Sequence, residues 1–110
     1  MAYDTDLADR IRELLGPLRG VDEKRMFGGL AFLINGNMSL AVSGQGGLMV
    51  RVPPNDTERL VGRPHVSPMV MAGREARGWL QVAADGVKTK RQLQRWVSQG
   101  AGYAKTLKPK

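Results

Sequence analysis

The sequence predicts an α+β fold, in which an antiparallel sheet of about five strands carries an N-terminal and a C-terminal helix packed on one face. Two observations lead to this prediction. Three apolar runs at 30–34, 38–42 and 48–52 are joined by turn-forming residues and indicate a three-stranded meander. Segments with helical spacing of apolar residues flank the strand-rich region at both ends. So small a meander is stable only if its apolar face is covered, and we expect the two helices to cover it.

The first helix is predicted over residues 5–15. Its apolar residues recur at i, i+4, i+7, i+8 and i+11, which is one helical face. These residues are Leu7, Ile11, Leu14 and Leu15 in the helix, and Leu18, which packs from the turn that follows it. Asp4 or Thr5 can cap the helix by accepting a hydrogen bond from a first-turn N–H, and Gly16-Pro17 ends it. Residues 19–25 form a charged connector that begins the first strand near Lys24.

The turns of the meander follow from its glycines and asparagines. Asn35-Gly36 separates the first two apolar runs and predicts a type I′ hairpin turn, which needs positive φ at both central residues. The glycine-rich segment 44–47 predicts a hairpin loop before the third strand. A phosphate-binding loop is disfavoured there, because no helix follows it.

The second half of the chain predicts a short helix and a second hairpin. Pro53-Pro54 stops the third strand, and Asn55 or Asp56 then caps a helix over 57–61. Residues 63–68 contain two prolines and are predicted to form a loop. The apolar runs 69–71 and 79–83, with a polar link between them, predict two further strands.

The last helix begins at a capping box made by Thr89 and Gln92. Its apolar face consists of Leu93, Trp96, Val97, Gly100, Ala101 and Ala104. Small residues on this face allow a close approach to the sheet, and Trp96 is the main anchor. Residues 105–110 are expected to be a frayed tail, and residues 1–110 form a single domain.

A tetrapeptide at the start of the meander is typical of one family. Met26-Phe27-Gly28-Gly29, followed by an apolar strand and Asn35-Gly36, resembles the N-terminal domain of the TfoX/Sxy proteins. The later strand 79–83 and the closing helix agree with that pattern. The resemblance implies the same fold and a bacterial protein related to competence regulators. Those regulators carry a second, helical domain with DNA-binding-like character, for which 110 residues leave no room, so we expect a stand-alone domain.

The glycines of the tetrapeptide have two interpretations. Gly28 and Gly29 permit either a backbone approach site for a partner or a strand kink beside a buried Phe27. The kink is favoured, because glycine in a strand usually marks local geometry.

The composition lacks the parts of common catalytic sites. Without cysteine there is no disulfide, thiolate nucleophile or cysteine-based metal site. The single histidine, His65, lies between Pro64 and Pro68 and is interpreted as a surface residue. An enzyme would need Arg63, His65, Arg74 and Glu75 to converge in a cleft. We therefore predict no catalytic, cofactor or metal site, and a protein that is not an enzyme.

Two features of the sequence bear on where in the cell the protein is found. No apolar run approaches the roughly 20 residues of a membrane span. Asp4, Asp6 and Asp9 occupy the segment where a signal peptide needs basic residues. We expect a soluble cytoplasmic protein without a membrane partner.

The net charge of +7 is concentrated at the end of the chain. Residues 85–110 contain seven basic residues and one acidic residue, a surplus of +6. Candidate nucleic-acid-binding residues are Lys88, Lys90, Arg91, Arg95 and Lys105, with Lys108 beyond them. Weak, sequence-independent binding of nucleic acid is one interpretation, and a solvated helix face is the other.

The leading hypothesis is a non-enzymatic regulatory or protein-interaction domain, with an unknown protein partner or a second copy of itself. The methionines are expected to be mostly in the core. Met49 alternates with Leu48 and Val50 and so faces the other side of its strand. Exposure of Met49 would mark a contact surface.

Overall fold

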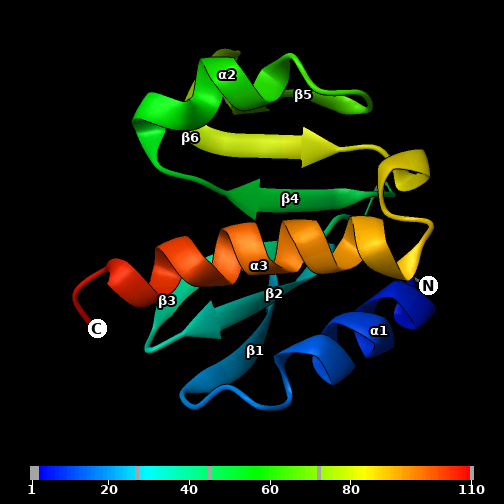
Figure 1. Cartoon of the computed structure of the whole chain (residues 1–110), viewed down its shortest axis with the longest axis vertical. Helices are drawn as coiled ribbons and strands as arrows, with labels where there is room; N and C mark the ends of the chain where they lie inside the picture. Colours follow the sequence, from blue (N-terminus) through cyan, green and yellow to red (C-terminus); the bar gives the residue numbers. More distant parts are fainter. Residues whose placement is uncertain (1–2, 27, 45, 72, 110) are drawn as a thin grey trace.

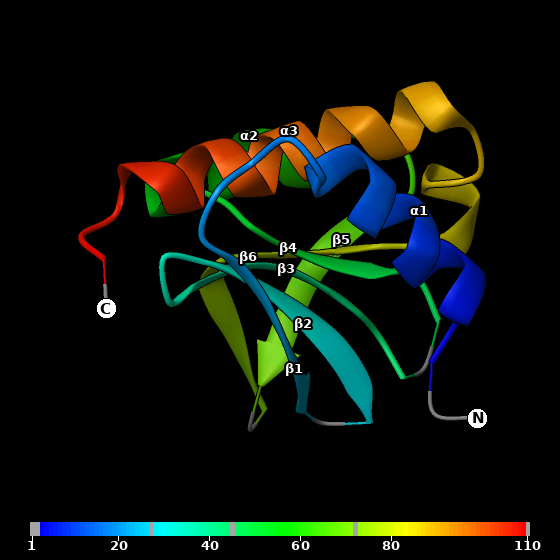
Figure 2. The ribbon, with the colours of Figure 1, turned by 90° about the horizontal axis from the view of Figure 1, so that it is seen from below.

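Six antiparallel strands form one sheet, and helices cover one of its faces (Figures 1 and 2). The structure is a computed structural model that describes residues 3–26, 28–44, 46–71 and 73–109. In chain order the elements are α1 (Thr5–Leu15), β1 (Val21–Met26), β2 (Gly29–Ile34), β3 (Asn37–Val42), β4 (Leu48–Arg51), the 3₁₀ turn η1 (Pro54–Asp56), α2 (Thr57–Val61), β5 (Val66–Met71), β6 (Arg74–Val82), the 3₁₀ turn η2 (Ala84–Gly86) and α3 (Lys90–Thr106). The strand order is β1-β2-β3-β4-β6-β5. The α+β prediction is confirmed, with six strands in place of about five.

The additional strand is β1, which the sequence presents as a charged connector. Residues 22–25 are all charged, so no apolar alternation reveals the strand. It pairs with β2 along its whole length, from Val21 opposite Ile34 to Met26 opposite Gly29. Because β1 is an edge strand, its charged side chains remain in solvent, a common feature of sheet edges. The sequence predicted that the first strand of the meander starts near Lys24, whereas the structure has two strands there, β1 ending at Met26 and β2 beginning at Gly29.

The second hairpin is longer than predicted. β5 includes part of the predicted loop 63–68, and β6 includes most of the polar link before Trp79. Pro68 is tolerated because β5 is the other edge strand, and the register shifts between Pro68 and Val70. The part of the link that contains Ala72 lies outside the described residues.

The predicted turns of the meander are confirmed. Asn35 and Gly36 have φ values of 53° and 84°, as a type I′ turn requires. Gly46 and Gly47 also have positive φ in the loop between β3 and β4, where the N–H of Ser43 donates to the carbonyl of Gly47 (3.1 Å).

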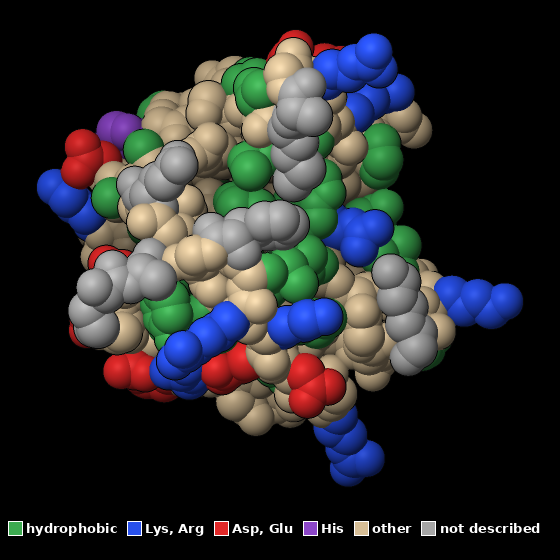
Figure 3. Space-filling model, turned by 180° about the vertical axis from the view of Figure 1, so that it is seen from behind, with side chains coloured by type: hydrophobic (Ala, Val, Ile, Leu, Met, Phe, Trp, Pro, Cys, Tyr) green, Lys and Arg blue, Asp and Glu red, His purple; other side chains and the backbone are tan. Residues whose placement is uncertain are grey.

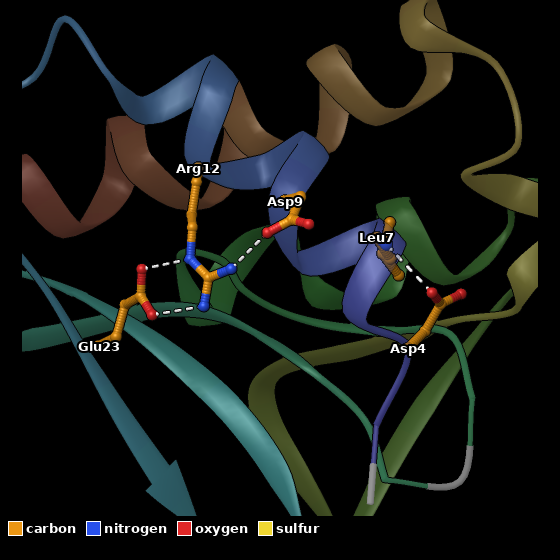
Figure 4. Close-up of polar contacts among 5 residues, drawn as sticks. All are labelled: Asp4, Leu7, Asp9, Arg12 and Glu23. Carbon is orange, nitrogen blue, oxygen red and sulfur yellow. Dashed lines mark hydrogen bonds and ion pairs between the residues drawn. The ribbon is translucent and has the colours of Figure 1, made fainter. Parts of the chain in front are cut away.

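Two of the three predicted helix caps are present. The side chain of Asp4 accepts a hydrogen bond from the N–H of Leu7 at the start of α1 (3.1 Å, Figure 4). At the start of α3, Thr89 and Gln92 exchange both hydrogen bonds of the capping box (3.1 and 3.0 Å). These caps satisfy N–H groups that have no partner within the helix.

The predicted side-chain cap of α2 is wrong. Asn55 lies within η1, and the Asp56 side chain makes no cap bond but lies 3.4 Å from Arg59. Thr57 links the segment to the sheet: its hydroxyl donates to the carbonyl of Pro54 (2.8 Å) and accepts from the N–H of Gly78 (2.9 Å).

The main core lies between the helices and one face of the sheet. α3 crosses β3 and β4 and also contacts α1 (Figure 2). The predicted apolar face of α3 is buried along its whole length. The largest fully buried side chains belong to Phe32, Ile11, Ile34, Leu40, Leu48, Leu60, Leu80 and Leu93.

An ion-pair network attaches α1 to the edge of the sheet. The guanidinium of Arg12 donates to both carboxylate oxygens of Glu23 on β1 (2.7 and 2.8 Å) and to Asp9 (2.5 Å, Figure 4). The hydrogen bonds from Arg12 lower the pKa of the Glu23 carboxyl below its usual value. On the opposite side of α1, Arg10 donates to the carbonyls of Val87 and Lys88 (3.3 and 3.1 Å).

The chain end is more ordered than the predicted frayed tail. Lys105 and Thr106 are helical, and the side-chain amide of Asn37 donates to the carbonyl of Lys108 (2.9 Å). Asn37 is buried, so this bond satisfies a polar group that would otherwise be unpaired. Lys110 lies outside the described residues.

Candidate functional site

The family-signature residues lie at the two ends of β2 and form no common site. Met26 ends β1, and Gly28 has a φ of +75° in the turn that follows. A Cβ on Gly29 would lie 2.2 Å from the carbonyl oxygen of Val42, so glycine is required for β2 to approach β3. This geometry supports the structural interpretation of the two glycines. Phe27 lies outside the described residues.

The second half of the signature has a similar structural role. Gly20, with φ +75°, accepts a hydrogen bond at its carbonyl from the N–H of Asn35 (2.9 Å). A Cβ on Gly20 would lie 2.3 Å from the side-chain oxygen of Asn35. The β2–β3 turn therefore packs directly on the connection between α1 and β1.

The face of the sheet turned away from the helices carries a second apolar cluster, which we call the open-face cluster. Its buried centre is Ala31, Ala41 and Met49, and the partly buried Met26, Leu33, Met38 and Met69 pack around it. Viewed from this side, hydrophobic side chains gather at the middle of the surface (Figure 3). The predicted alternation at β4 is confirmed, because Leu48 and Val50 belong to the main core.

The centre of the open-face cluster is only narrowly accessible. Met49 is 9% exposed, so this side chain is shielded by its four partly buried neighbours. The accessible apolar surface thus comes from Met26, Leu33, Met38 and Met69. Next to the cluster, the guanidinium of Arg51 lies 5.8 Å from the ring centre of Trp79 and 5.9 Å from that of Tyr103. This geometry is a cation–π contact with both rings.

The predicted basic surface divides into separate parts. All five candidates, Lys88, Lys90, Arg91, Arg95 and Lys105, are exposed. Lys88 precedes α3 and pairs with Asp85 (3.0 Å). This pair holds the pKa of the Asp85 carboxyl below its usual value. Lys105 is ten residues beyond Arg95, which corresponds to about 15 Å along the helix.

Arg91 and Arg95 instead lie beside residues 63–65, which come from a distant segment of the chain. They line a cavity of about 190 Å³ with Arg63, Pro64, His65, Gly86, Gln92 and Trp96. Among the described residues, the side chains of Arg63, Arg91 and Arg95 make no hydrogen bond or ion pair. The sequence placed Arg91 and Arg95 among the basic candidates but gave no sign that the segment containing Arg63 and His65 packs beside them.

The four-residue combination required for an enzyme does not form. Arg63 and His65 share the cavity beside α3, whereas Glu75 lines a different cavity with Thr57 and Glu58 of α2. Arg74 lines neither of these two cavities. Over residues 3–26, 28–44, 46–71 and 73–109, no group of three or more His, Cys, Asp or Glu side chains is placed to hold a metal ion. No helix in that part of the chain is long and apolar enough to cross a membrane.

Comparison with known proteins gives one finding. The family model described as the TfoX N-terminal domain matches residues 13–104, from the second half of α1 to near the end of α3. No curated protein and no solved structure matches the chain.

Proposed function

Because this chain belongs to the family of TfoX N-terminal domains, we propose that it is a non-enzymatic regulatory domain that acts by binding a protein partner through its open-face cluster. The observation that carries this proposal is an apolar cluster rich in methionine on the side of the sheet that the helices leave uncovered (Figures 2 and 3). The absence of cysteine suits a reducing compartment, and we propose the cytoplasm.

The composition of this face supports a contact role. An antiparallel sheet with one solvated face usually alternates apolar residues toward the core and polar residues toward water. Here β2, β3 and β4 place Leu33, Met38 and Met49 on the face away from the main core. Methionine side chains are flexible and polarisable, which suits a surface that adapts to a partner.

The edges of the sheet are less suited to a partner than its face. β1 exposes four consecutive charged residues, and β5 contains Pro68, which lacks an N–H to donate. Charges and proline are the usual means by which sheet edges resist pairing with another strand. This contrast favours the open-face cluster over strand addition.

The test compares two double variants, each of which replaces two long side chains by glutamine. We expect Met26→Gln with Met69→Gln to abolish binding of a partner that co-purifies with the wild type, because both side chains are partly buried around the cluster. A control variant, Lys90→Gln with Lys105→Gln, changes exposed residues of α3 and keeps the partner. Affinity purification followed by mass spectrometry measures both, and circular dichroism verifies that each variant is folded.

The same variants test whether the partner is a second copy of this chain. In that case light scattering detects a dimer for the wild type and a monomer for Met26→Gln with Met69→Gln. The proposal is wrong if the wild type is a monomer and the methionine variant retains every partner of the wild type.

A second candidate function is weak, sequence-independent binding of nucleic acid through α3. The specific observation is that α3 contains no acidic residue, while Lys90, Arg91, Arg95 and Lys105 are exposed along it. Such a surface would neutralise backbone phosphates without reading bases.

A further inference from the structure

We propose that the cavity lined by Arg63, His65, Arg91 and Arg95 is a binding site for a terminal phosphate group, the dianion of a phosphate monoester or diphosphate. This site is separate from the open-face cluster and shares no residue with it. The proposal is therefore independent of the proposed protein partner.

Three segments of the chain build the cavity. Arg63 and His65 come from the connection between α2 and β5, Gly86 ends η2, and Arg91 and Arg95 lie on the first two turns of α3. Three arginines line this one cavity, although Arg63 is 28 residues before Arg91 in the sequence. Positive charges that line one cavity repel one another, and an anion bound among them offsets that repulsion.

The backbone fixes the position of the His65 side chain. The N–H of Val66 donates to the carbonyl of Arg63 (3.3 Å), which closes a turn with Pro64 and His65 at its centre. The carbonyl of His65 accepts from the N–H of Ala83 (2.8 Å), which fastens the turn to the end of β6. A Cβ on Gly86 would lie 2.9 Å from the Cβ of His65, so the turn packs tightly on η2.

His65 itself has an unfavourable backbone conformation. Its φ is +66°, in the left-handed region that favours glycine. Glycine is the usual residue at the third position of a turn with positive φ there. A histidine at this position places an imidazole at the wall of the cavity, and the side chain is exposed to solvent (purple in Figure 3). Conformations of this kind gather at ligand-binding sites.

No carboxylate side chain is among the described residues that line the cavity. The acidic residue beside it is Asp85 on η2, whose charge is compensated by the ion pair with Lys88 (3.0 Å). The hydrogen bond and charge of Lys88 lower the pKa of the Asp85 carboxyl, and the charge of His65 contributes in the same direction. The electrostatic balance at the cavity therefore favours an anion.

The chemistry of the lining selects a phosphate with a high charge. Guanidinium groups bind phosphate oxygens through paired N–H donors, and three of them match a dianion better than the monoanionic diester of a nucleic-acid backbone. A volume of about 190 Å³ accommodates one or two phosphate groups and leaves the remainder of the ligand outside. The phosphate can belong to a small molecule or to the 5′ end of a nucleic acid.

The single histidine provides a direct probe. The imidazole C–H signals in a proton NMR spectrum belong to His65 alone, because the chain has one histidine. On titration with inorganic pyrophosphate at low salt, we expect these signals to shift saturably. We expect Arg63→Gln and Arg95→Gln each to weaken binding by about tenfold or more. Lys105→Gln, which removes one charge from α3 outside the cavity, leaves the affinity within about twofold.

A glycine variant separates binding from folding. His65→Gly fits the positive φ, so we expect it to fold at least as well as the wild type and to bind pyrophosphate more weakly by calorimetry. The proposal is overturned if pyrophosphate gives no saturable shift up to about 10 mM. It is equally overturned if the arginine variants bind as tightly as the wild type.

A further arm identifies the source of the phosphate. If a duplex with a 5′-phosphate competes with pyrophosphate better than the same duplex with a 5′-hydroxyl, the ligand is a nucleic-acid end. If the two duplexes compete equally and pyrophosphate still saturates the site, the phosphate belongs to a small molecule.

Discussion

At the scale of single residues, two glycines in α3 have opposite roles. Gly100 is buried against β3, and a Cβ there would lie 2.6 Å from the carbonyl oxygen of Ser39. Gly102 is exposed, and a Cβ there would meet nothing within 4 Å. The first glycine allows the helix to approach the sheet, whereas the second only weakens the helix.

Alanine at these two positions should therefore have opposite effects. We expect Gly100→Ala to lower the free energy of unfolding by about 1–3 kcal/mol, because the backbone must move to accept the methyl group. Gly102→Ala should raise it by up to about 1 kcal/mol, since alanine loses less backbone entropy than glycine. Urea denaturation measures both, and equal effects of the two variants would contradict the packing argument.

At the scale of elements, the contact between α1 and β1 shows how a charged strand is held in place. None of the six residues of β1 is buried, so its position depends on pairing with β2 and on the two hydrogen bonds between Arg12 and Glu23. Both side chains are partly exposed, so solvent screens this ion pair and its effect on stability is small.

The pH dependence of stability tests this contact. Arg12 lowers the pKa of Glu23 in the folded protein, so the unfolded state binds the proton more readily. The stabilisation is present above the usual carboxyl pKa and disappears as the pH falls through the lowered value. We expect Arg12→Gln and Glu23→Gln to lower the melting temperature at pH 7, and this difference from the wild type to disappear at an acidic pH below the lowered pKa of Glu23.

The control for this experiment is Arg19→Gln, which removes a positive charge from an exposed residue near the same edge. The melting temperature of this control should equal that of the wild type, both at pH 7 and at the acidic pH. A loss in Arg12→Gln that is as large at acidic pH as at pH 7 would show that packing of the long side chain, and not the ion pair, stabilises the contact.

At the scale of the whole molecule, the sheet separates two different surfaces. One side carries the helices, with the basic residues of α3 and the cavity beside Arg91 and Arg95. The other side carries the open-face cluster. A protein partner and an anion could therefore occupy the molecule at the same time.

Salt dependence distinguishes a nucleic-acid surface from a solvated helix face. If α3 binds nucleic acid, fluorescent duplex and single-stranded DNA and RNA should bind at low salt. The logarithm of affinity should fall linearly with that of salt concentration, by about 0.9 for each duplex phosphate neutralised. Arg91→Ala with Arg95→Ala should reduce both the affinity and the slope.

The matched control is Lys24→Ala on β1, which removes one exposed positive charge far from α3 in the strand order and should change neither quantity. The absence of binding at low salt would exclude this second function. The basic surplus of the chain end would then serve solubility.

The sequence determined the elements whose signals are local. Helix α1, the Asn35-Gly36 turn, the three central strands, the capping box at Thr89 and the buried face of α3 follow from periodicity and turn chemistry within a few residues. The family assignment also followed from the local signature at Met26–Gly29 and Asn35-Gly36. These features depend on side chains that are neighbours in the chain.

Only the tertiary structure decided the features that depend on distant segments. β1 is a strand because β2 supplies its hydrogen-bond partners, although its own sequence resembles a connector. The chain end is held by Asn37, 71 residues before Lys108. Arg63 and His65 line one cavity with Arg91 and Arg95 because the connection between α2 and β5 is bonded to the end of β6, close to the start of α3. Hydrogen-bond partners and charge clusters of this kind arise from packing between segments, so the one-dimensional pattern of residues does not reveal them.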